Sequence, residues 1–184
     1  MKHTKHTNLE RRNNELFAPN EISILGSNCT IISDLVSKVS TKLSGYKLAY
    51  FDASHAKEVE ENNVSEYVFH HQGNLQITTS GNVNKFQQRL EFAQFDYVFI
   101  NGNHYQGSKQ ILILDEAKEA SVLKRLDQLE HIQFVVKLKS KTEYFSFLEQ
   151  QYPQIKNIPC YTIDEVDKIT NHIRSLIQEK IPPV

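Results

Sequence analysis

The chain has 184 residues, enough for one ordinary domain, and its 21 basic and 22 acidic residues give a net charge of −1. This balance gives no reason to expect a nucleic acid or an acidic membrane surface as a partner. The two cysteines, Cys29 and Cys160, stand far apart, which argues against a disulfide framework and a thiolate zinc site. No apolar run approaches the roughly 18 residues that span a bilayer. We therefore expect a cytoplasmic protein with no nucleic acid and no membrane as partner.

The chain divides into three regions by composition. Residues 1–20 are basic, polar and without periodicity, which predicts an arm that is either flexible or docked on the body or on a partner. Residues 21–180 alternate helical and strand patterns and are expected to form a single α/β domain. Residues 181–184, with two prolines, resemble the start of a linker or a truncated end.

The first apolar runs predict a β-α-β unit. A strand at 22–25 ends at Gly26, and apolar residues at helical spacing then mark a helix from Ile31 to Leu43, which Ser44-Gly45 stops. A second strand follows at 48–51. Because a crossover of this kind makes its two strands parallel, the unit predicts a parallel sheet.

The same alternation continues to the end of the chain. We expect further strands at 67–70, 75–79, 97–100, 111–114, 134–136 and 159–163, the first two forming a hairpin. We expect further helices at 83–90, 122–129, 141–150 and 166–177, the last with Asp164 as its N-cap. The predicted fold class is α/β, a three-layer αβα arrangement around a mainly parallel sheet.

The loop after the strand at 97–100 is the first candidate site. This strand is a run of β-branched and aromatic residues, typical of a buried strand in a parallel sheet, and it ends in a polar loop. Ligands of open α/β sheets sit at the carboxyl ends of the strands. Asn101, Asn103 and His104 are therefore candidate binding residues.

The eight histidines raise the question of a metal. His55 and His104 both follow strands and would meet Asp52 at the carboxyl edge, with His70 or His71 as a third ligand. His70 and His71 would point to opposite faces of their strand. Solvated or hydrogen-bonded histidines are the interpretation that the sequence favours, so no metal ligand is predicted. Cys29 is interpreted as a small residue at a helix start.

The order of these features resembles that of the MobB-type family, the P-loop GTP-binding adaptors of molybdopterin-guanine dinucleotide biosynthesis. The likeness covers residues 22–180. It rests on the strand–Gly–helix–strand unit and on these segments: Ser65–Gly73, Asp96–Gly102, Lys109–Ile111 and Tyr161–Asp167. The resemblance implies a P-loop-NTPase-like fold. Residues 1–20 and the proline tail further resemble proteins in which such a domain precedes a MobA-type molybdenum-cofactor nucleotidyltransferase.

The phosphate loop departs from the family pattern. A working loop reads G-x-x-x-x-G-K-[ST], in which backbone amides and the lysine hold phosphates and the hydroxyl holds Mg²⁺. Here the segment Gly26–Ile32 lacks the second glycine and the lysine, and it is about three residues too short. Asn101 stands where the family has glutamate. The departures argue against GTP hydrolysis and against tight binding of GTP with Mg²⁺.

A weaker anion site stays open at the same place. The amino terminus of the predicted helix offers unpaired amides, and Ser27, Asn28 and Thr30 would hydrogen-bond a phosphate there. The alternative is simple N-capping by Ser27 or Asn28. The full set of predicted cofactor-binding residues is Gly26, Ser27, Asn28, Thr30, Asp52, His55, Asn101, Asn103 and His104.

Three functions remain open. The first is a non-catalytic adaptor of molybdenum-cofactor biosynthesis with a degenerate nucleotide pocket, docking on a nucleotidyltransferase domain in cis or in trans. The second is a GTP or ATP phosphohydrolase that uses an unusual site of Asp52, His55, Asp96 and His104. The third is a structural dimerisation domain, since the family that the chain resembles forms homodimers.

Overall fold

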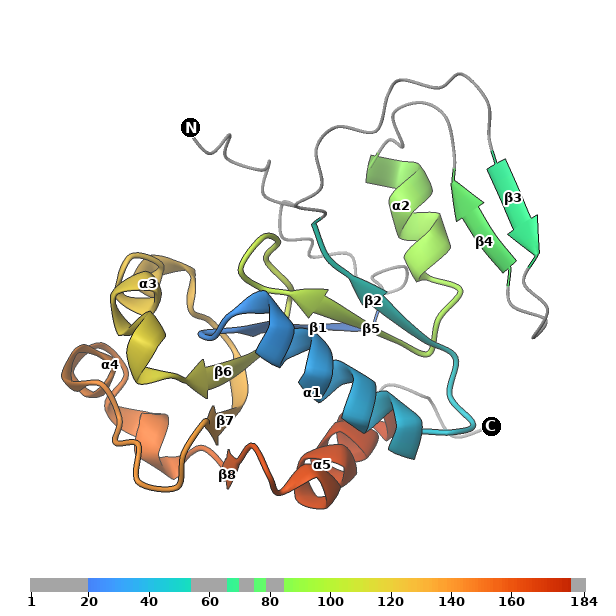
Figure 1. Ribbon diagram of the computed structural model, residues 1–184. Coiled ribbons are helices and arrows are strands. Elements are labelled where there is room, and N and C mark those ends of the chain that lie inside the picture. The colour runs from blue at the N-terminus through green and yellow to red at the C-terminus, as the bar shows by residue number, and fades with distance from the viewer. Residues whose placement is uncertain (1–19, 54–65, 70–74, 79–84, 180–184) are drawn as a thin grey trace.

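The core of the molecule is a six-stranded parallel sheet in the order β2-β5-β1-β6-β7-β8 (Figure 1). The computed structural model describes residues 20–53, 66–69, 75–78 and 85–179. The strands of the sheet are β1 (Glu21–Leu25), β2 (Leu48–Phe51), β5 (Tyr97–Asn101), β6 (Gln110–Leu114), β7 (Ile132–Lys137) and β8 (Cys160–Thr162). A separate antiparallel pair is formed by β3 (Glu66–Phe69) and β4 (Leu75–Thr78), as predicted. The α/β class with a mainly parallel sheet is confirmed.

Helices cover both faces of the sheet (Figure 1). They are α1 (Cys29–Lys42), α2 (Lys85–Phe92), α3 (Glu119–Leu123), α4 (Ser146–Gln151) and α5 (Val166–Gln178). Short 3₁₀ turns lie at η1 (Glu116–Lys118), η2 (Leu126–Gln128) and η3 (Pro153–Asn157). Across the described ranges, no helix combines the length and the apolar character needed to cross a membrane.

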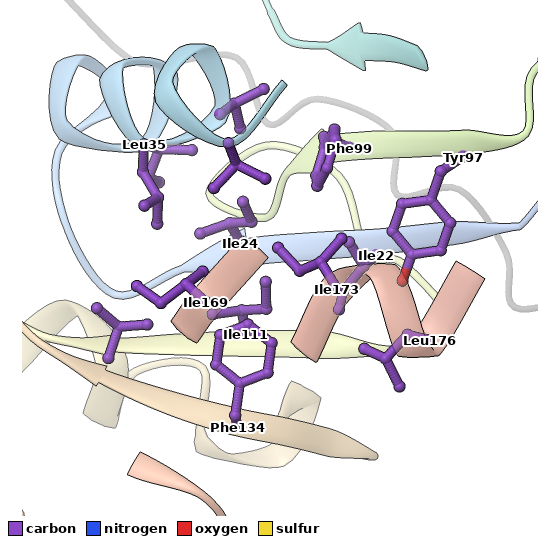
Figure 2. Packing of buried hydrophobic residues seen from close by; sticks show 14 of the residues in the cluster. Ile22, Ile24, Leu35, Tyr97, Phe99, Ile111, Phe134, Ile169, Ile173 and Leu176 are labelled. Atoms are coloured by element: carbon purple, nitrogen blue, oxygen red, sulfur yellow. The ribbon is translucent and has the colours of Figure 1, made fainter. Parts of the chain in front are cut away.

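The alternation of side chains along β6 explains the three layers. Ile111 and Ile113 point into a core shared with α1 and α5, which Figure 2 shows at close range. Leu112 and Leu114 point into a second core that contains residues of α3, α4 and η3. Every residue of β6 is buried, and from Ile111 to Leu114 the strand is apolar on both faces, as expected of the centre of a parallel sheet.

Three predicted details are wrong. The helix expected at 122–129 is broken: α3 ends at Leu123, and the 3₁₀ turn η2 follows, where the Tyr152 hydroxyl lies 2.8 Å and 2.6 Å from the carbonyl oxygens of Leu126 and Leu129. The helix expected at 141–150 begins at Ser146, after an extended Phe145 whose side chain is buried in the second core. The N-cap of α5 is Glu165, not Asp164, because a turn in which the Glu165 carboxylate accepts from the Thr162 amide at 2.8 Å precedes the helix.

Tyr97 offers a test of the first core. Its side chain is buried beside Leu176 of α5 (Figure 2), and its hydroxyl has no hydrogen-bond partner among the described residues. Burial, followed by the charges of Glu179 and Glu21, raises the pKa of Tyr97. Tyr97→Phe removes only the unpaired hydroxyl, so we expect it to raise the unfolding free energy by about 1 kcal/mol in urea titrations.

Tyr152 provides the matched control for this substitution. Its hydroxyl lies within hydrogen-bond distance of two backbone carbonyls, so Tyr152→Phe is expected to lower the unfolding free energy by about 1 kcal/mol. Equal effects of the two substitutions would contradict the assignment of an unpaired hydroxyl at Tyr97.

Candidate functional site

The carboxyl ends of four adjacent strands bring polar side chains to one edge of the sheet. Ser27 follows β1, Asp52 follows β2, Asn101 ends β5 and Asp115 follows β6. These strands are neighbours in the order β2-β5-β1-β6, so the four residues line one continuous stretch of the edge. Ser27, Asn101 and Asp115 are buried, and Asp52 is half-buried.

One group of side chains, here called the Asp52 cluster, consists of Tyr50, Asp52, Asn101, His104 and Cys29. Asp52 accepts hydrogen bonds from the Asn101 amide at 2.9 Å, from its neighbouring backbone amide at 2.7 Å and from the Tyr50 hydroxyl at 2.9 Å. His104 Nε2 lies 3.8 Å from Asp52 Oδ1 and 3.4 Å from Cys29 Sγ. Burial and then the bond to Asp52 raise the pKa of Tyr50, so its hydroxyl stays a donor at neutral pH.

A second group, the Ser27 cluster, consists of Ser27, Asn103, Asp115 and Arg125. The buried Ser27 hydroxyl donates to Asp115 Oδ2 at 2.7 Å, and the Asn103 side chain donates to the Ser27 carbonyl at 2.7 Å. Arg125 Nη1 donates to Asn103 Oδ1 at 3.2 Å. Asn101 Oδ1 accepts from the Asn103 backbone amide at 3.1 Å, which joins the two clusters into one network.

The connection between β1 and α1 is short. Gly26, Ser27 and Asn28 alone separate the strand from the helix. Asn28 is the N-cap of α1, and its Oδ1 accepts from the Ile31 amide at 2.9 Å. The capped amide is therefore already satisfied by the protein, as is the Ser27 hydroxyl. Thr30 is exposed in the first turn, where its carbonyl accepts from the Ser33 hydroxyl.

Two cations stand beside this connection. Lys118 and Arg125 line a small cavity of about 10 Å³ together with Gly26, Ser27 and Asn103. This volume corresponds to about one water molecule. Burial lowers the pKa of Arg125, which still leaves the guanidinium charged at neutral pH. A larger hollow of about 320 Å³ lies at the amino end of β7, near His131 and Tyr152, and no predicted site residue lines it.

Asp96, a predicted member of the alternative enzyme site, lies apart from this edge. Asp96 precedes β5 at the opposite end of the sheet, where its carboxylate accepts from the Lys47 amide at 2.6 Å. A site that joins Asp96 to Asp52 and His104 is therefore excluded. His55 lies outside the described residues, as do His70 and His71. Within the described part of the chain, no group of three or more His, Cys, Asp or Glu side chains is arranged to hold a metal ion.

Comparisons with known proteins give the fold. No family model and no curated protein matches this chain. The crystal structure of molybdopterin-guanine biosynthesis protein B (mobB) superimposes with a TM-score of 0.57 at 14% identity, covering 86% of this chain and 99% of that one. Bacillus subtilis MobB superimposes with a TM-score of 0.51 at 15% identity, covering 84% and 97%. The chain has a MobB-like fold. At this identity the likeness extends to the fold alone.

Sequence reasoning missed several members of the two clusters. Asp115 is not among the predicted residues, although it directly follows a buried strand, the same signal that singles out Asn101. Tyr50, Cys29 and Arg125 belong to the clusters only through contacts across the fold. Cys29 and His104 are 75 positions apart, and nothing in the local pattern joins them.

Proposed function

We propose that this chain is a non-catalytic adaptor of molybdenum-cofactor biosynthesis, which docks on a nucleotidyltransferase that makes molybdopterin-guanine dinucleotide. The observation that carries the proposal concerns the connection between β1 and α1, where a phosphate loop would lie in a MobB-like fold. Side chains there that could bind phosphate are already hydrogen-bonded within the protein. Asn28 caps α1, and Ser27 donates to the buried carboxylate of Asp115. In a nucleotide-binding loop these groups would face phosphates.

Charge supports the same conclusion. Asp115 is buried and accepts from Ser27 of the loop at 2.7 Å, so a triphosphate bound there would approach a carboxylate. The lysine that reaches the terminal phosphates is absent from the connection between β1 and α1. GTP and Mg²⁺ would then be bound by the nucleotidyltransferase partner, and this chain would act through its surface.

The first test is nucleotidyl transfer. A purified MobA-type nucleotidyltransferase is supplied with molybdopterin and GTP–Mg²⁺, and formation of the dinucleotide is followed with increasing amounts of this chain. We expect the rate to rise and then saturate, with heat-denatured chain as the control. An unchanged rate at saturating excess of the chain would contradict the adaptor function.

A second candidate is the nucleotide-dependent enzyme, because Asp52 and His104 approach each other at the carboxyl edge. Thermal unfolding with millimolar GTP–Mg²⁺ or ATP–Mg²⁺ separates the two candidates. The adaptor predicts no shift in Tm, whereas a ligand at 100 times its Kd would stabilise by about 2.7 kcal/mol, several degrees for a domain of this size. Turnover that His104→Gln abolishes would establish the enzyme instead.

A further inference from the structure

Three nucleophilic or titratable side chains converge from three separate elements. Cys29 is the first residue of α1, Asp52 follows β2, and His104 lies in the loop after β5. One imidazole nitrogen, Nε2 of His104, faces both the Cys29 sulfur at 3.4 Å and the Asp52 carboxylate at 3.8 Å. A proton on that nitrogen would lie between two groups that attract it, because each is an anion when deprotonated.

Two features near the Cys29 sulfur favour negative charge. The thiol sits in the first turn of a fourteen-residue helix, where the helix dipole favours negative charge. Arg125 is also within electrostatic reach: burial lowers the pKa of Arg125, and the charge of Cys29 raises it. Cys29 is partly exposed. A thiol near a base and cations, at a helix amino terminus, is the environment of reactive cysteines.

We propose that Cys29 is a modification site: a reactive thiol that exchanges with low-molecular-weight disulfides and carries the resulting mixed disulfide, with His104 moving the proton. This assignment is independent of the adaptor function, since it concerns a reaction of the chain alone.

The exchange is balanced without any further reagent. The Cys29 thiol gives its proton to His104 Nε2, and the thiolate attacks one sulfur of the disulfide RSSR. A bond forms between Cys29 Sγ and that sulfur while the S–S bond of the reagent breaks. The leaving thiolate takes the electron pair and then the proton from the imidazolium. Cys29 is oxidised to the mixed disulfide, and one RSH is produced.

The geometry favours exchange over acyl transfer. In a hydrolytic triad the acid holds the imidazole through the nitrogen that does not face the nucleophile. Here Asp52 Oδ1 and Cys29 Sγ both face Nε2, so the carboxylate stabilises a protonated imidazole from the same side as the thiol. Disulfide exchange needs only a thiolate and a proton for the leaving group.

The chain carries its own control in Cys160, which is exposed. Single-cysteine proteins Cys160→Ser and Cys29→Ser are treated with hydroxyethyl disulfide at pH 7, and mass spectrometry follows the mixed disulfide with time. If solvent exposure alone set the rate of mixed-disulfide formation, Cys160 would react faster than Cys29. We expect Cys29 to react about tenfold faster than Cys160, and a small thiol to reverse the modification.

The contribution of His104 is measured in the Cys160→Ser background. His104→Gln, confirmed as folded by thermal unfolding, is expected to slow the reaction of Cys29 about tenfold. The proposal is overturned if Cys29 reacts no faster than Cys160, or if His104→Gln leaves the rate of Cys29 unchanged. The comparison of the two thiols stands even where the histidine variant fails to fold.

Discussion

The Gly26→Ala protein is expected to lose about 3 kcal/mol or more of unfolding free energy, a large share of the stability of an ordinary domain. Gly26 has φ +96°, a conformation in which a side chain is strained. A Cβ built there lies 2.2 Å from the backbone oxygen of Ile113 and 3.1 Å from a Leu112 methyl. Because that oxygen belongs to the central strand β6, the contact cannot be relieved by a side-chain rotation.

Gly45 is the matched control for this substitution. It also has a positive φ, +105°, but no atom lies within 4 Å of the position of a Cβ. Gly45→Ala is therefore expected to lower the unfolding free energy by about 1 kcal/mol, because only the backbone conformation is strained and no atom is in the way. Urea unfolding of both variants measures the difference, and equal losses would contradict the steric argument. The expected result assigns Gly26 to packing of the β1–α1 connection against β6, a role that needs no phosphate.

The buried strands were the most predictable part of this fold. The strands β1, β5, β6 and β7 coincide with short apolar runs, because a strand covered on both faces needs apolar side chains at nearly every position. The region after β6 was less predictable. Its apolar residues have helical spacing, yet α3 ends at Leu123 and the chain continues as η2, which packs beside the Tyr152 hydroxyl. Tertiary contacts of this kind override local propensity and leave no trace in the local pattern.

The part of the candidate site that could be predicted consists of residues directly after the ends of parallel strands. The rule that ligand-binding loops follow parallel strands led to Asp52, Asn101, Asn103 and His104. Hydrogen bonds join the first three, and His104 Nε2 lies 3.8 Å from Asp52 Oδ1. The same rule cannot tell which residue of a loop turns inward, nor which distant side chain meets it. The contact between Cys29 and His104 depends on how α1 lies beside the β5–β6 loop, a property of the assembled sheet.

Asn101→Asp is expected to destabilise the protein strongly above neutral pH. Asn101 is fully buried and donates to Asp52 Oδ1 at 2.9 Å. The substitution replaces that donor with a second carboxylate in contact with the first. Two carboxylates in contact cannot both ionise at low cost, so one of them acquires a pKa raised by about two units, corresponding to about 3 kcal/mol.

The direction of the pH dependence follows from the sign of that shift. A carboxyl whose folded pKa lies above its unfolded value stabilises the fold below the unfolded pKa, near 4, and this contribution is lost as the pH rises through the folded pKa. The difference from the unsubstituted protein should therefore be small near pH 4 and reach about 3 kcal/mol at pH 8 in urea titrations. A difference that does not change with pH would contradict the contact between the two side chains.

Two further proteins isolate the contact from the change of side chain. Asn28→Asp makes the same replacement at the exposed N-cap of α1, where a carboxylate is as good a cap as asparagine, so we expect little change in stability. Adding Asp52→Asn to Asn101→Asp exchanges donor and acceptor across the 2.9 Å contact and should restore most of the loss at pH 8. Because the double variant again holds one carboxylate and one amide, and residue 101 still accepts from the Asn103 amide, failure to recover would mean that position 52 itself needs a carboxylate to accept from the Tyr50 hydroxyl and the Ala53 amide. Recovery would establish that this edge of the sheet accommodates a single negative charge shared between positions 52 and 101.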